Sequence, residues 1–357
     1  MPLSQLTLHN FRNYPELRLN ASPGFMVFSG ANGAGKTNIL EAVSLLAPGR
    51  GLRRAALRDI AFQGGPGDFA VAAQMNDVNL GSGTSIESPD RRKTRINEAA
   101  VPTNDLAEWL SILWLTPSMD RLFAEGASGR RNFLDRLVTA LEPAHAGHCA
   151  RYEAARRERN RLLADGYPSD RDWMEGLDVQ LARFGSLVAE ARSRMVAALN
   201  QKLQQSDSSI FATPAVLLAD DQLHTEDQLR QMLQQNRAAD RAAGRTTRGP
   251  HRSDLNVFHA AKQQPADKCS TGEQKALLFS IILAHADLIA EQRDSRPILL
   301  LDEVAAHLDP ERRAALFDKL AERGGQVWLT GTEPELFKGI PASALHFEVS
   351  DGTIRRR

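Results

Sequence analysis

Hydrophobic and polar positions change their period twice along the chain. In about the first hundred residues, apolar and polar positions alternate in short segments, which is typical of half-buried strands. These segments are residues 6–8, 17–19, 69–75 and 94–97. Glycine-rich stretches at 64–67 and 81–83 predict turns between strands. The amino-terminal region is therefore expected to be rich in β-structure.

From about residue 105 to 245 the apolar period becomes that of an α-helix. Apolar side chains recur at three- and four-residue spacing, most clearly in 133–141 and 177–188. No heptad pattern continues for more than a few turns, so a long coiled coil is not expected. We predict a mainly helical lobe at residues 111–254.

Strand patterns return after about residue 255. Residues 297–302 form an apolar run that ends in Asp302, as expected for a buried parallel strand, and 326–330 form a second run. The pattern predicts an α/β protein. Its head, a mixed sheet with helices, combines residues 1–110 and 255–357, and the helical lobe is inserted between these two parts.

Composition limits the function only weakly. Lys and Arg number 44, as do Asp and Glu, so a site for a polyanion must be a local patch. Cys149 and Cys269 are far apart, without a second Cys or a His at ligand spacing, so neither a disulfide framework nor a zinc site is expected. No apolar run approaches the length of a membrane span and no basic leader is present, which indicates a soluble, cytoplasmic protein.

The most specific motif is an octet of the form G-x-x-x-x-G-K-[ST], between an apolar segment at 25–28 and a helical segment. Its members are Gly30, Ala31, Asn32, Gly33, Ala34, Gly35, Lys36 and Thr37. Glycines let successive backbone N–H groups point into one concavity that holds phosphate oxygens. Lys36 can reach the β- and γ-phosphates of ATP, and the Thr37 hydroxyl can ligate Mg²⁺. The strand–loop–helix context disfavours a glycine-rich turn without a ligand.

Two acids end the apolar run at 297–302. Asp302 would lie at the carboxyl edge of the sheet, where it can hold Mg²⁺ beside Thr37. Glu303 could polarise the water that attacks the γ-phosphate, as a general base. Alone, the pair could equally be two solvated acids after a buried strand; beside a P-loop, the catalytic interpretation is favoured.

Two more segments precede predicted helices. Residues 270–274 form a small polar turn before an apolar helix, where the Ser270 hydroxyl and the helix N-terminus can bind an anion. Residues 306–309 follow the acidic pair, and Asp309 stands directly before Pro310. Each segment could also be a helix cap without a ligand. The order of all these motifs along the chain is therefore stronger evidence for a nucleotide site than either segment alone.

In this order the motifs resemble those of the ATP-binding-cassette ATPases. The resemblance implies that the signature of one subunit, with Ser270 and Gly272, closes on the γ-phosphate held by another, and that Asp309 joins this nucleotide site. Residues 10–14 are similar to a feature of the chromosome-maintenance branch, which implies that Arg12 and Asn13 bind nucleotide.

The gap of 266 residues from Lys36 to Asp302 is far longer than in transporter subunits. It holds segments 115–123, 129–135 and 249–255, which resemble the RecF family almost from end to end of the chain. The resemblance implies ATP-dependent DNA binding and a weak, DNA-stimulated ATPase. It also implies an ATP-dependent homodimer on single- or double-stranded DNA, at gaps or junctions, and work with RecR and RecA, whose loading it assists.

The signature departs from the usual Leu-Ser-Gly-Gly-Gln, because Cys269, Thr271 and Glu273 occupy its variable places while Ser270 and Gly272 are kept. No histidine follows 326–330, where transporters carry one, so no histidine is assigned a catalytic role.

Candidate DNA contacts are Arg53, Arg54 and Arg58, which follow the P-loop helix with few acids nearby. The cluster at 151–161 is interleaved with acids, which indicates salt-bridged helix surface, and 355–357 reads as a solvated tail. For all of these arginines, a merely solvated face remains the alternative.

Three other functions fit the sequence less well than an ATP-dependent DNA-binding protein. An SMC-like chromosome organiser needs hundreds of residues of coiled coil. A cytosolic transporter ATPase is disfavoured by the long helical insertion and by residues 10–14. An ATP-driven nuclease would need a further acidic metal site, and the sequence after Asp309 offers none.

Overall fold

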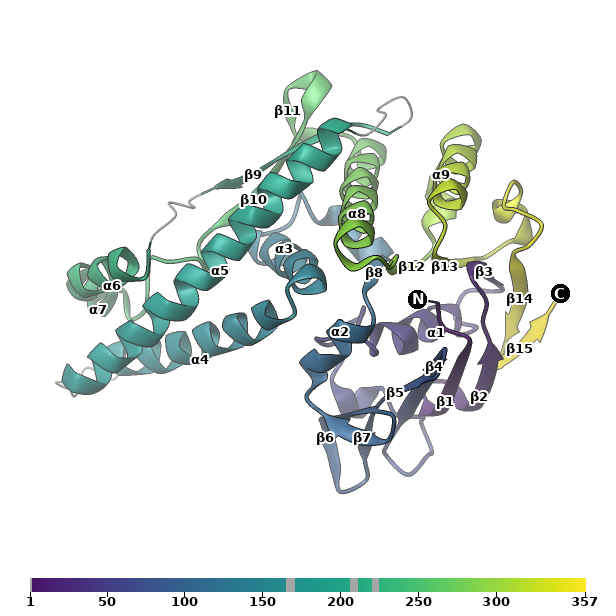
Figure 1. The fold of residues 1–357 in the computed structure, drawn as a ribbon, viewed down its shortest axis with the longest axis horizontal. Helices are drawn as coiled ribbons and strands as arrows, with labels where there is room; N and C mark the ends of the chain where they lie inside the picture. The colour runs from purple at the N-terminus through teal and green to yellow at the C-terminus, as the bar shows by residue number, and fades with distance from the viewer. Residues whose placement is uncertain (1, 165–170, 206–210, 220–224) are drawn as a thin grey trace. The chain divides into compact units, whose positions relative to one another are not determined.

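The computed structural model describes residues 2–164, 171–205, 211–219 and 225–357 (Figure 1). The chain forms two compact units, here called the head and the lobe. The head comprises Met1–Arg121, Asp207–Ala212 and Ser270–Arg357, and the lobe comprises Leu122–Ser206 and Thr213–Cys269. Among the described residues, no helix is long and apolar enough to cross a membrane.

The head is built around a six-stranded sheet in the order β15-β14-β3-β13-β12-β8. Its strands are β3 (Gly24–Ser29), β8 (Ile112–Leu115), β12 (Ile298–Leu301), β13 (Gln326–Gly331), β14 (Leu345–Ser350) and β15 (Thr353–Arg356). All neighbours pair in parallel except β14 and β15. Strands β12 and β13 are buried along their whole length, as their continuous apolar sequences predict.

A second, antiparallel sheet has the order β2-β1-β4-β5-β6-β7. Its strands are β1 (Gln5–Phe11), β2 (Tyr14–Asn20), β4 (Ala70–Met75), β5 (Val78–Ser85), β6 (Ser88–Ile96) and β7 (Ala99–Val101). The turn predicted at 81–83 is wrong, because these residues lie inside β5 and pair with β4 and β6. Ladder hydrogen bonds on both sides outweigh the local turn preference of glycine and serine.

Helix α1 (Lys36–Ser44) shares one apolar core with both sheets of the head. Residues of α1 such as Ile39 and Val43 are fully buried with Leu8 of β1 and Trp328 of β13. Two longer helices, α8 (Thr271–Arg293) and α9 (Pro310–Arg323), lie on the other side of the parallel sheet (Figure 1). The short α2 (Leu106–Trp109) precedes β8. The P-loop helix is therefore held between two sheets.

Within its described residues, the lobe contains five α-helices and a small sheet of order β11-β10-β9. They are α3 (Ala127–Leu141), α4 (Ala144–Ala164), α5 (Arg171–Gln205), α6 (Glu226–Gln235), α7 (Arg237–Ala243), β9 (Pro214–Ala219), β10 (Asp254–His259) and β11 (Gln264–Pro265). Tyr152 of α4, Leu181 of α5 and Leu229 of α6 meet in its core. Short 3₁₀ helices occur at Leu57–Asp59, Thr103–Asp105, Pro117–Arg121, Ala260–Lys262, Ala266–Lys268, Val304–His307 and Pro334–Phe337.

The unit boundaries lie later in the chain than the predicted ones at 110/111 and 254/255. Strand β8 pairs with β12, so the head continues to Arg121. Strand β10 pairs with β9 and β11, so the lobe continues to Cys269. Both differences come from strand pairing between distant segments, which the composition of the chain does not record. The carboxyl-terminal arginines are likewise not a tail, because Arg355 and Arg356 belong to β15.

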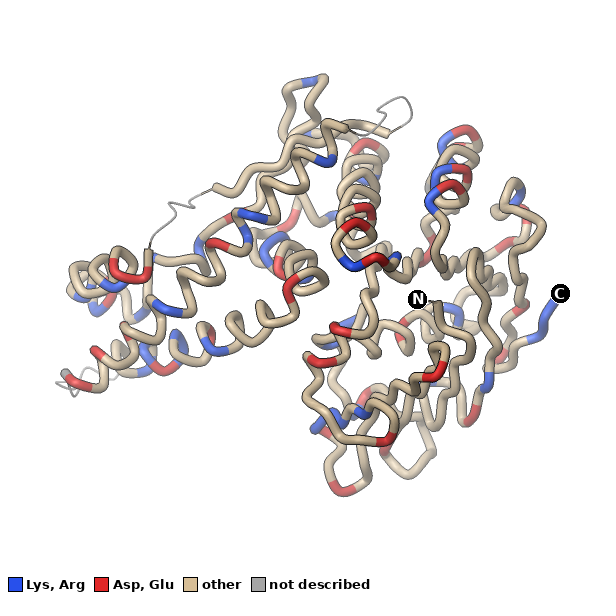
Figure 2. The backbone as a smooth tube through the Cα atoms, viewed as in Figure 1, with Lys and Arg blue, Asp and Glu red and all other residues tan. Residues whose placement is uncertain are grey.

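Basic and acidic residues are interspersed along α4 (Figure 2), and the predicted surface pairs are present as Arg156–Glu153 and Arg161–Glu158. Arg159, in contrast, is fully buried, so the surface interpretation is wrong for it. Its guanidinium donates to Asp178 at 2.8 Å and to Asp240 at 2.7 Å, and both acids are also fully buried. A buried charge of this kind needs its partners, because desolvation is otherwise uncompensated.

We expect Arg159→Ala to destabilise the lobe by about 3–5 kcal/mol, because it leaves the buried Asp240 carboxylate without its cation and leaves Asp178 with Arg237 alone. Denaturant unfolding followed by circular dichroism measures the loss. The neighbouring Arg157 is exposed, so Arg157→Ala should change stability by no more than about 0.5 kcal/mol. Equal stabilities of the two variants would contradict a structural role for the buried pair.

Candidate nucleotide-binding site

The P-loop connects β3 to α1 through a turn that requires glycine at its last position. Gly35 has φ 109°, and a Cβ there would lie 2.3 Å from the Asn13 amide nitrogen. As the N-cap of α1, Gly35 offers no side-chain hydrogen bond to the first turn. The backbone N–H groups at this helix end are therefore available to an anion, with the helix dipole in the same direction.

Lys36 is buried, with only 4% of its side chain exposed. Its ammonium donates to the carbonyl oxygens of Gly30 at 2.8 Å and Ala31 at 2.9 Å, which bridges the P-loop. It also lies 3.6 Å from the Glu303 carboxylate. The structure thus brings the predicted phosphate-binding lysine and the predicted general base into direct electrostatic contact.

The Asp302 carboxylate joins the P-loop helix to two strands. Its Oδ1 accepts hydrogen bonds from Thr37 Oγ1 at 2.8 Å and from Thr330 Oγ1 at 2.7 Å. Burial raises the pKa of Asp302, and the two hydroxyl hydrogen bonds offset only part of this effect. A cation would stabilise the charged carboxylate here, and the hydroxyl and carboxylate oxygens of Thr37 and Asp302 are the ligands that Mg²⁺ prefers.

Glu303 has left-handed backbone dihedrals, with φ 54°. Its N–H donates to Thr330 Oγ1 at 2.9 Å, which holds the residue in this unusual conformation directly after β12. A cavity of about 20 Å³, lined in part by Asp302, Glu303 and Thr116, lies beside the carboxylate. This volume suffices for about one water molecule.

Arg12 and Asn13 contact the P-loop and the helix that follows it. Arg12 forms two hydrogen bonds to the Glu41 carboxylate, at 2.9 and 2.6 Å, and Asn13 donates to the Ala34 carbonyl at 3.1 Å. Asn38 donates to the Asn13 side chain, and Arg53 donates to both Asn38 and Glu41. These contacts make Arg12 and Asn13 positioning residues; their direct contact with nucleotide stays a prediction.

Ser270, Gly272 and Asp309 form no described hydrogen bond with the P-loop of their own chain. Ser270 is the exposed N-cap of α8 in a capping box with Glu273, and Asp309 is the exposed N-cap of α9, bonded to the Arg312 N–H. The Cβ position of Gly272 is open, with its nearest atom 3.8 Å away on Arg312. All three positions can therefore be approached by a second molecule.

The three candidate DNA contacts have different surroundings. Arg53 is bound to Glu41 at 3.0 Å, and Arg58 is paired with Asp90 through both oxygens. Arg54 is exposed and has φ 56°, and no described residue forms an ion pair with it. Another basic side chain, Arg92, has a structural role, because it donates to the carbonyls at the end of α1 and burial lowers its pKa to about 10.

Two residues of this site were missed by the sequence analysis. Thr330 bonds both Asp302 and Glu303 but carries no motif of its own. The only available signal was its place at the carboxyl end of a predicted strand. Glu41 is buried between Arg12 and Arg53, and a buried acid on the P-loop helix needs a cation partner, which could have indicated it.

The family described as RecF/RecN/SMC N terminal domain matches residues 2–353. Two curated proteins called DNA replication and repair protein RecF, from Mesorhizobium japonicum and Brucella abortus, are 48% and 47% identical to the chain. Each match spans 99% of this chain, and 97% and 95% of the respective relative.

Solved structures agree in fold. The recombination mediator protein RecF-ATPrS in the RecFOR pathway has a TM-score of 0.87 at 21% identity, over 99% of this chain and 97% of that chain. An Smc head domain from Pyrococcus furiosus has a TM-score of 0.55 at 15% identity, over 100% of this chain and 96% of that chain. The predicted fold class, an ABC-type α/β head with a mixed sheet and an inserted helical lobe, is confirmed.

We expect Lys36→Ala to lower ATP affinity at least about tenfold, because one charge-assisted contact to phosphate contributes about 1.5–3 kcal/mol. Isothermal titration measures the affinity. The control is Lys338→Ala, since Lys338 is exposed and lies outside the P-loop. Because Lys36 is buried, circular dichroism must show that the variant is folded; a folded variant with unchanged affinity would exclude the P-loop as the ATP site.

Proposed function

The chain belongs to the RecF family of DNA replication and repair proteins, and from this premise we propose that it is an ATP-driven switch on DNA. ATP binding joins two heads into a dimer on DNA, and slow hydrolysis releases it. The protein is cytoplasmic, acts with RecR at gapped or junction DNA, and assists RecA loading. Identity of 48% and 47% to RecF relatives over 99% of the chain favours this function over a transporter ATPase or an SMC-like organiser.

The observation that carries the proposal is the contact between Thr37 and Asp302 at the carboxyl edge of the parallel sheet. Thr37 is the second residue of the P-loop helix and Asp302 directly follows a strand distant in sequence, yet their oxygens are 2.8 Å apart. Mg²⁺ bound by these oxygens would neutralise phosphate charge. Residues of the P-loop would hold the β- and γ-phosphates through backbone N–H groups and Lys36.

Lys36 and Glu303 suggest how binding and hydrolysis are linked. A triphosphate offers Lys36 a stronger partner than the single carboxylate 3.6 Å away. When Lys36 turns to the phosphates, Glu303 is free to accept a proton from water in the neighbouring cavity. Until ATP binds, Lys36 holds the Glu303 carboxylate in an ion pair, so the base is not free to act. This restraint is consistent with a slow ATPase.

The proposed dimer is supported by residues that form no described contact with the P-loop of their own head. Ser270 and Asp309 are exposed at the N-termini of two helices of the head, which favour anions. We therefore assign Ser270 and Gly272 to the γ-phosphate bound by the opposite head, and Asp309 to the same nucleotide site. ATP is then buried between two heads, and neither head completes the site alone.

Arg53 connects the nucleotide site to the proposed DNA surface. It shares Glu41 with Arg12, and it opposes the burial that raises the pKa of Asp302. Binding of ATP and Mg²⁺ changes the charge around Asp302, so it changes the electrostatic environment of Arg53. Arg54, the next residue, is exposed to contact a DNA phosphate.

We expect Glu303→Gln to bind ATP normally but to hydrolyse it about a hundredfold more slowly, because an amide cannot accept the proton. ATP-bound dimers should then accumulate, which sedimentation measures. Adding Ser270→Arg to this variant should return the protein to monomers with ATP still bound, since Ser270 acts on the other head's nucleotide.

The control for the arginine introduced by Ser270→Arg is Lys268→Arg, at an exposed position just before the signature. This control variant should leave the dimer intact. Near-normal turnover in Glu303→Gln would remove Glu303 from its role. A stable dimer after Ser270→Arg would exclude closure of Ser270 on the partner's ATP.

We expect Arg54→Glu combined with Arg58→Glu to weaken DNA binding and to reduce the salt dependence of log K by about 2, roughly one for each lost phosphate contact. Fluorescence anisotropy at several salt concentrations, with saturating ATP, measures both. Arg53 is left in place, because its replacement would also break the contact with Glu41.

The control is Arg355→Glu with Arg356→Glu, two exposed arginines on β15. Equal loss in both double variants would mean that the DNA surface is broader than proposed. If neither variant loses affinity, DNA binds elsewhere on the molecule.

A further inference from the structure

The lobe contains a polar cavity of about 590 Å³, and every residue that lines it belongs to the lobe. Two segments that resemble the RecF family but have no place in the nucleotide site, 129–135 in α3 and 249–255, contribute to its walls, together with residues 245–247. Helices α4 and α5 complete it through Tyr152, Arg156 and Arg192. The volume is in the range of small-molecule binding pockets.

The lining is strongly basic although the chain as a whole is neutral. Five arginines and two acids line the cavity, which leaves three positive charges. Arg192 is paired with Asp135, and Arg156 with Glu153. Within the described part of the chain, the other three, Arg131, Arg245 and Arg252, form no ion pair.

Arg131 lies near two other cations of the cavity. Burial, together with the charges of Arg192 and Arg252, lowers the pKa of Arg131, and the nearby acids Asp254 and Asp135 offset only part of this effect. Among the described contacts, its side chain donates to the Ser253 carbonyl at 3.0 Å, and Arg245 and Arg252 are exposed. An anion in the cavity would therefore stabilise the charged form of Arg131.

One wall of the cavity is rigid before any ligand binds. Arg192 is held by both oxygens of Asp135, by the Pro250 carbonyl and by Ser253 Oγ. Despite burial, hydrogen bonds from His145 and Arg192 lower the pKa of Asp135 to about 2, so it stays charged. These hydrogen bonds fix the position of the arginine, and two of its partners, Asp135 and Pro250, line the cavity with it.

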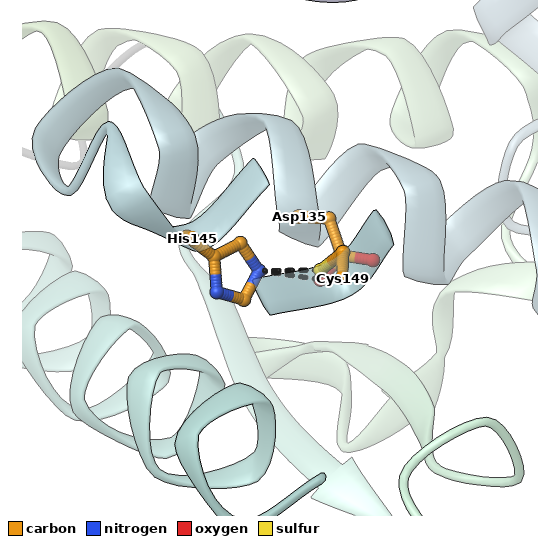
Figure 3. A group of neighbouring side chains, drawn as sticks. All are labelled: Asp135, His145 and Cys149. Carbon is orange, nitrogen blue, oxygen red and sulfur yellow. Dashed lines mark hydrogen bonds and ion pairs between the residues drawn. The ribbon is translucent and has the colours of Figure 1, made fainter. Parts of the chain in front are cut away.

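A cluster beside the cavity has side chains close enough together to hold a metal ion: Asp135, His145 and Cys149 (Figure 3). The expectation that neither cysteine has a histidine at ligand spacing is wrong, because His145 lies one helical turn before Cys149. However, both Asp135 oxygens already bind the Arg192 cation, and burial raises the pKa of Cys149 to about 12, which disfavours the thiolate that a metal needs. The cluster instead supports the cavity wall.

Another part of the wall is held by a neutral histidine. Burial and the charge of Arg156 lower the pKa of His251 to about 4. Its Nδ1 lies 2.7 Å from the Tyr152 hydroxyl and its Nε2 lies 3.1 Å from the Thr246 carbonyl. Gly249 allows this arrangement, because a Cβ there would lie 2.6 Å from the Tyr152 hydroxyl oxygen. His251 therefore adds no charge of its own, and the cavity depends on arginines for anion binding.

We propose that this cavity binds the phosphate group of a nucleotide-sized anion, at a site separate from the P-loop. Arg131, Arg245 and Arg252 supply the charge, and Arg192 supplies a fixed edge. Arginine matches phosphate with paired N–H donors, which suits a terminal phosphate with several free oxygens. A duplex carries its phosphates on the outside of a wide rod and could touch only the rim. The phosphate belongs to a free nucleotide or to the end of a nucleic-acid strand.

Hydrogen–deuterium exchange tests the site directly, because segments 244–253 and 128–136 report on the cavity and 30–40 reports on the P-loop. The probes are inorganic tripolyphosphate, deoxyadenosine monophosphate, and one single strand with and without a terminal phosphate. At ten times its Kd, a bound probe should slow exchange in the two cavity segments about tenfold. Protection by the mononucleotide identifies a free ligand, and protection only by the phosphorylated strand identifies a strand end.

Arg245→Ala with Arg252→Ala should abolish protection of the cavity segments and leave that of 30–40 unchanged, whereas Lys36→Ala should do the reverse. Arg157→Ala with Arg241→Ala, two exposed arginines of the lobe outside the cavity, is the matched control. The proposal fails if no probe protects the cavity segments of the native protein, or if their protection is lost with Lys36. Neither result depends on whether the head hydrolyses ATP or binds DNA.

Discussion

The carboxylate of Asp302 is the constraint on which the head depends. One oxygen accepts hydrogen bonds from Thr37 and Thr330, so a single atom joins the P-loop helix to the ends of two strands. This is possible only because β12 and β13 are parallel neighbours whose carboxyl ends meet at one edge. Burial disfavours the ionised acid. The group that aligns the site is therefore also one that a bound cation would stabilise, so a cation held there would also fix the arrangement of the P-loop.

The parts of this site that the sequence predicts are those that lie within one short segment. The P-loop and the pair Asp302–Glu303 were found because each follows a strand directly and needs only local context. Thr330 was not, because its role depends on strand order rather than on its neighbours in sequence. The same reason explains β8, which joins the head sheet by pairing with a strand that follows it by almost two hundred residues. The fold class could be predicted, whereas the exact unit boundaries could not.

The polar network behind the P-loop shows how a second surface can respond to nucleotide. Glu41 is buried and must be neutralised, and both Arg12 and Arg53 approach it. The two arginines come from the amino-terminal hairpin and from the segment after α1, so one carboxylate ties both to the helix that begins at Lys36. A shift of that helix would move all three elements together, because no group in the network can leave without exposing a buried charge.

Equal numbers of acids and bases hide two kinds of arginine in this chain. Arg159 and Arg192 are buried and Arg92 is partly buried, and their hydrogen bonds to acids or carbonyls hold helices in place. Arg131, Arg245 and Arg252 line a cavity and form no ion pair with any residue that the structure describes. The net charge counts both kinds of arginine alike. Only the second kind leaves positive charge that a bound anion can neutralise. A run of arginines in the sequence is therefore uninformative until the acids that fold against it are known, and the buried acids of the lobe come from segments that lie far from the arginines they neutralise.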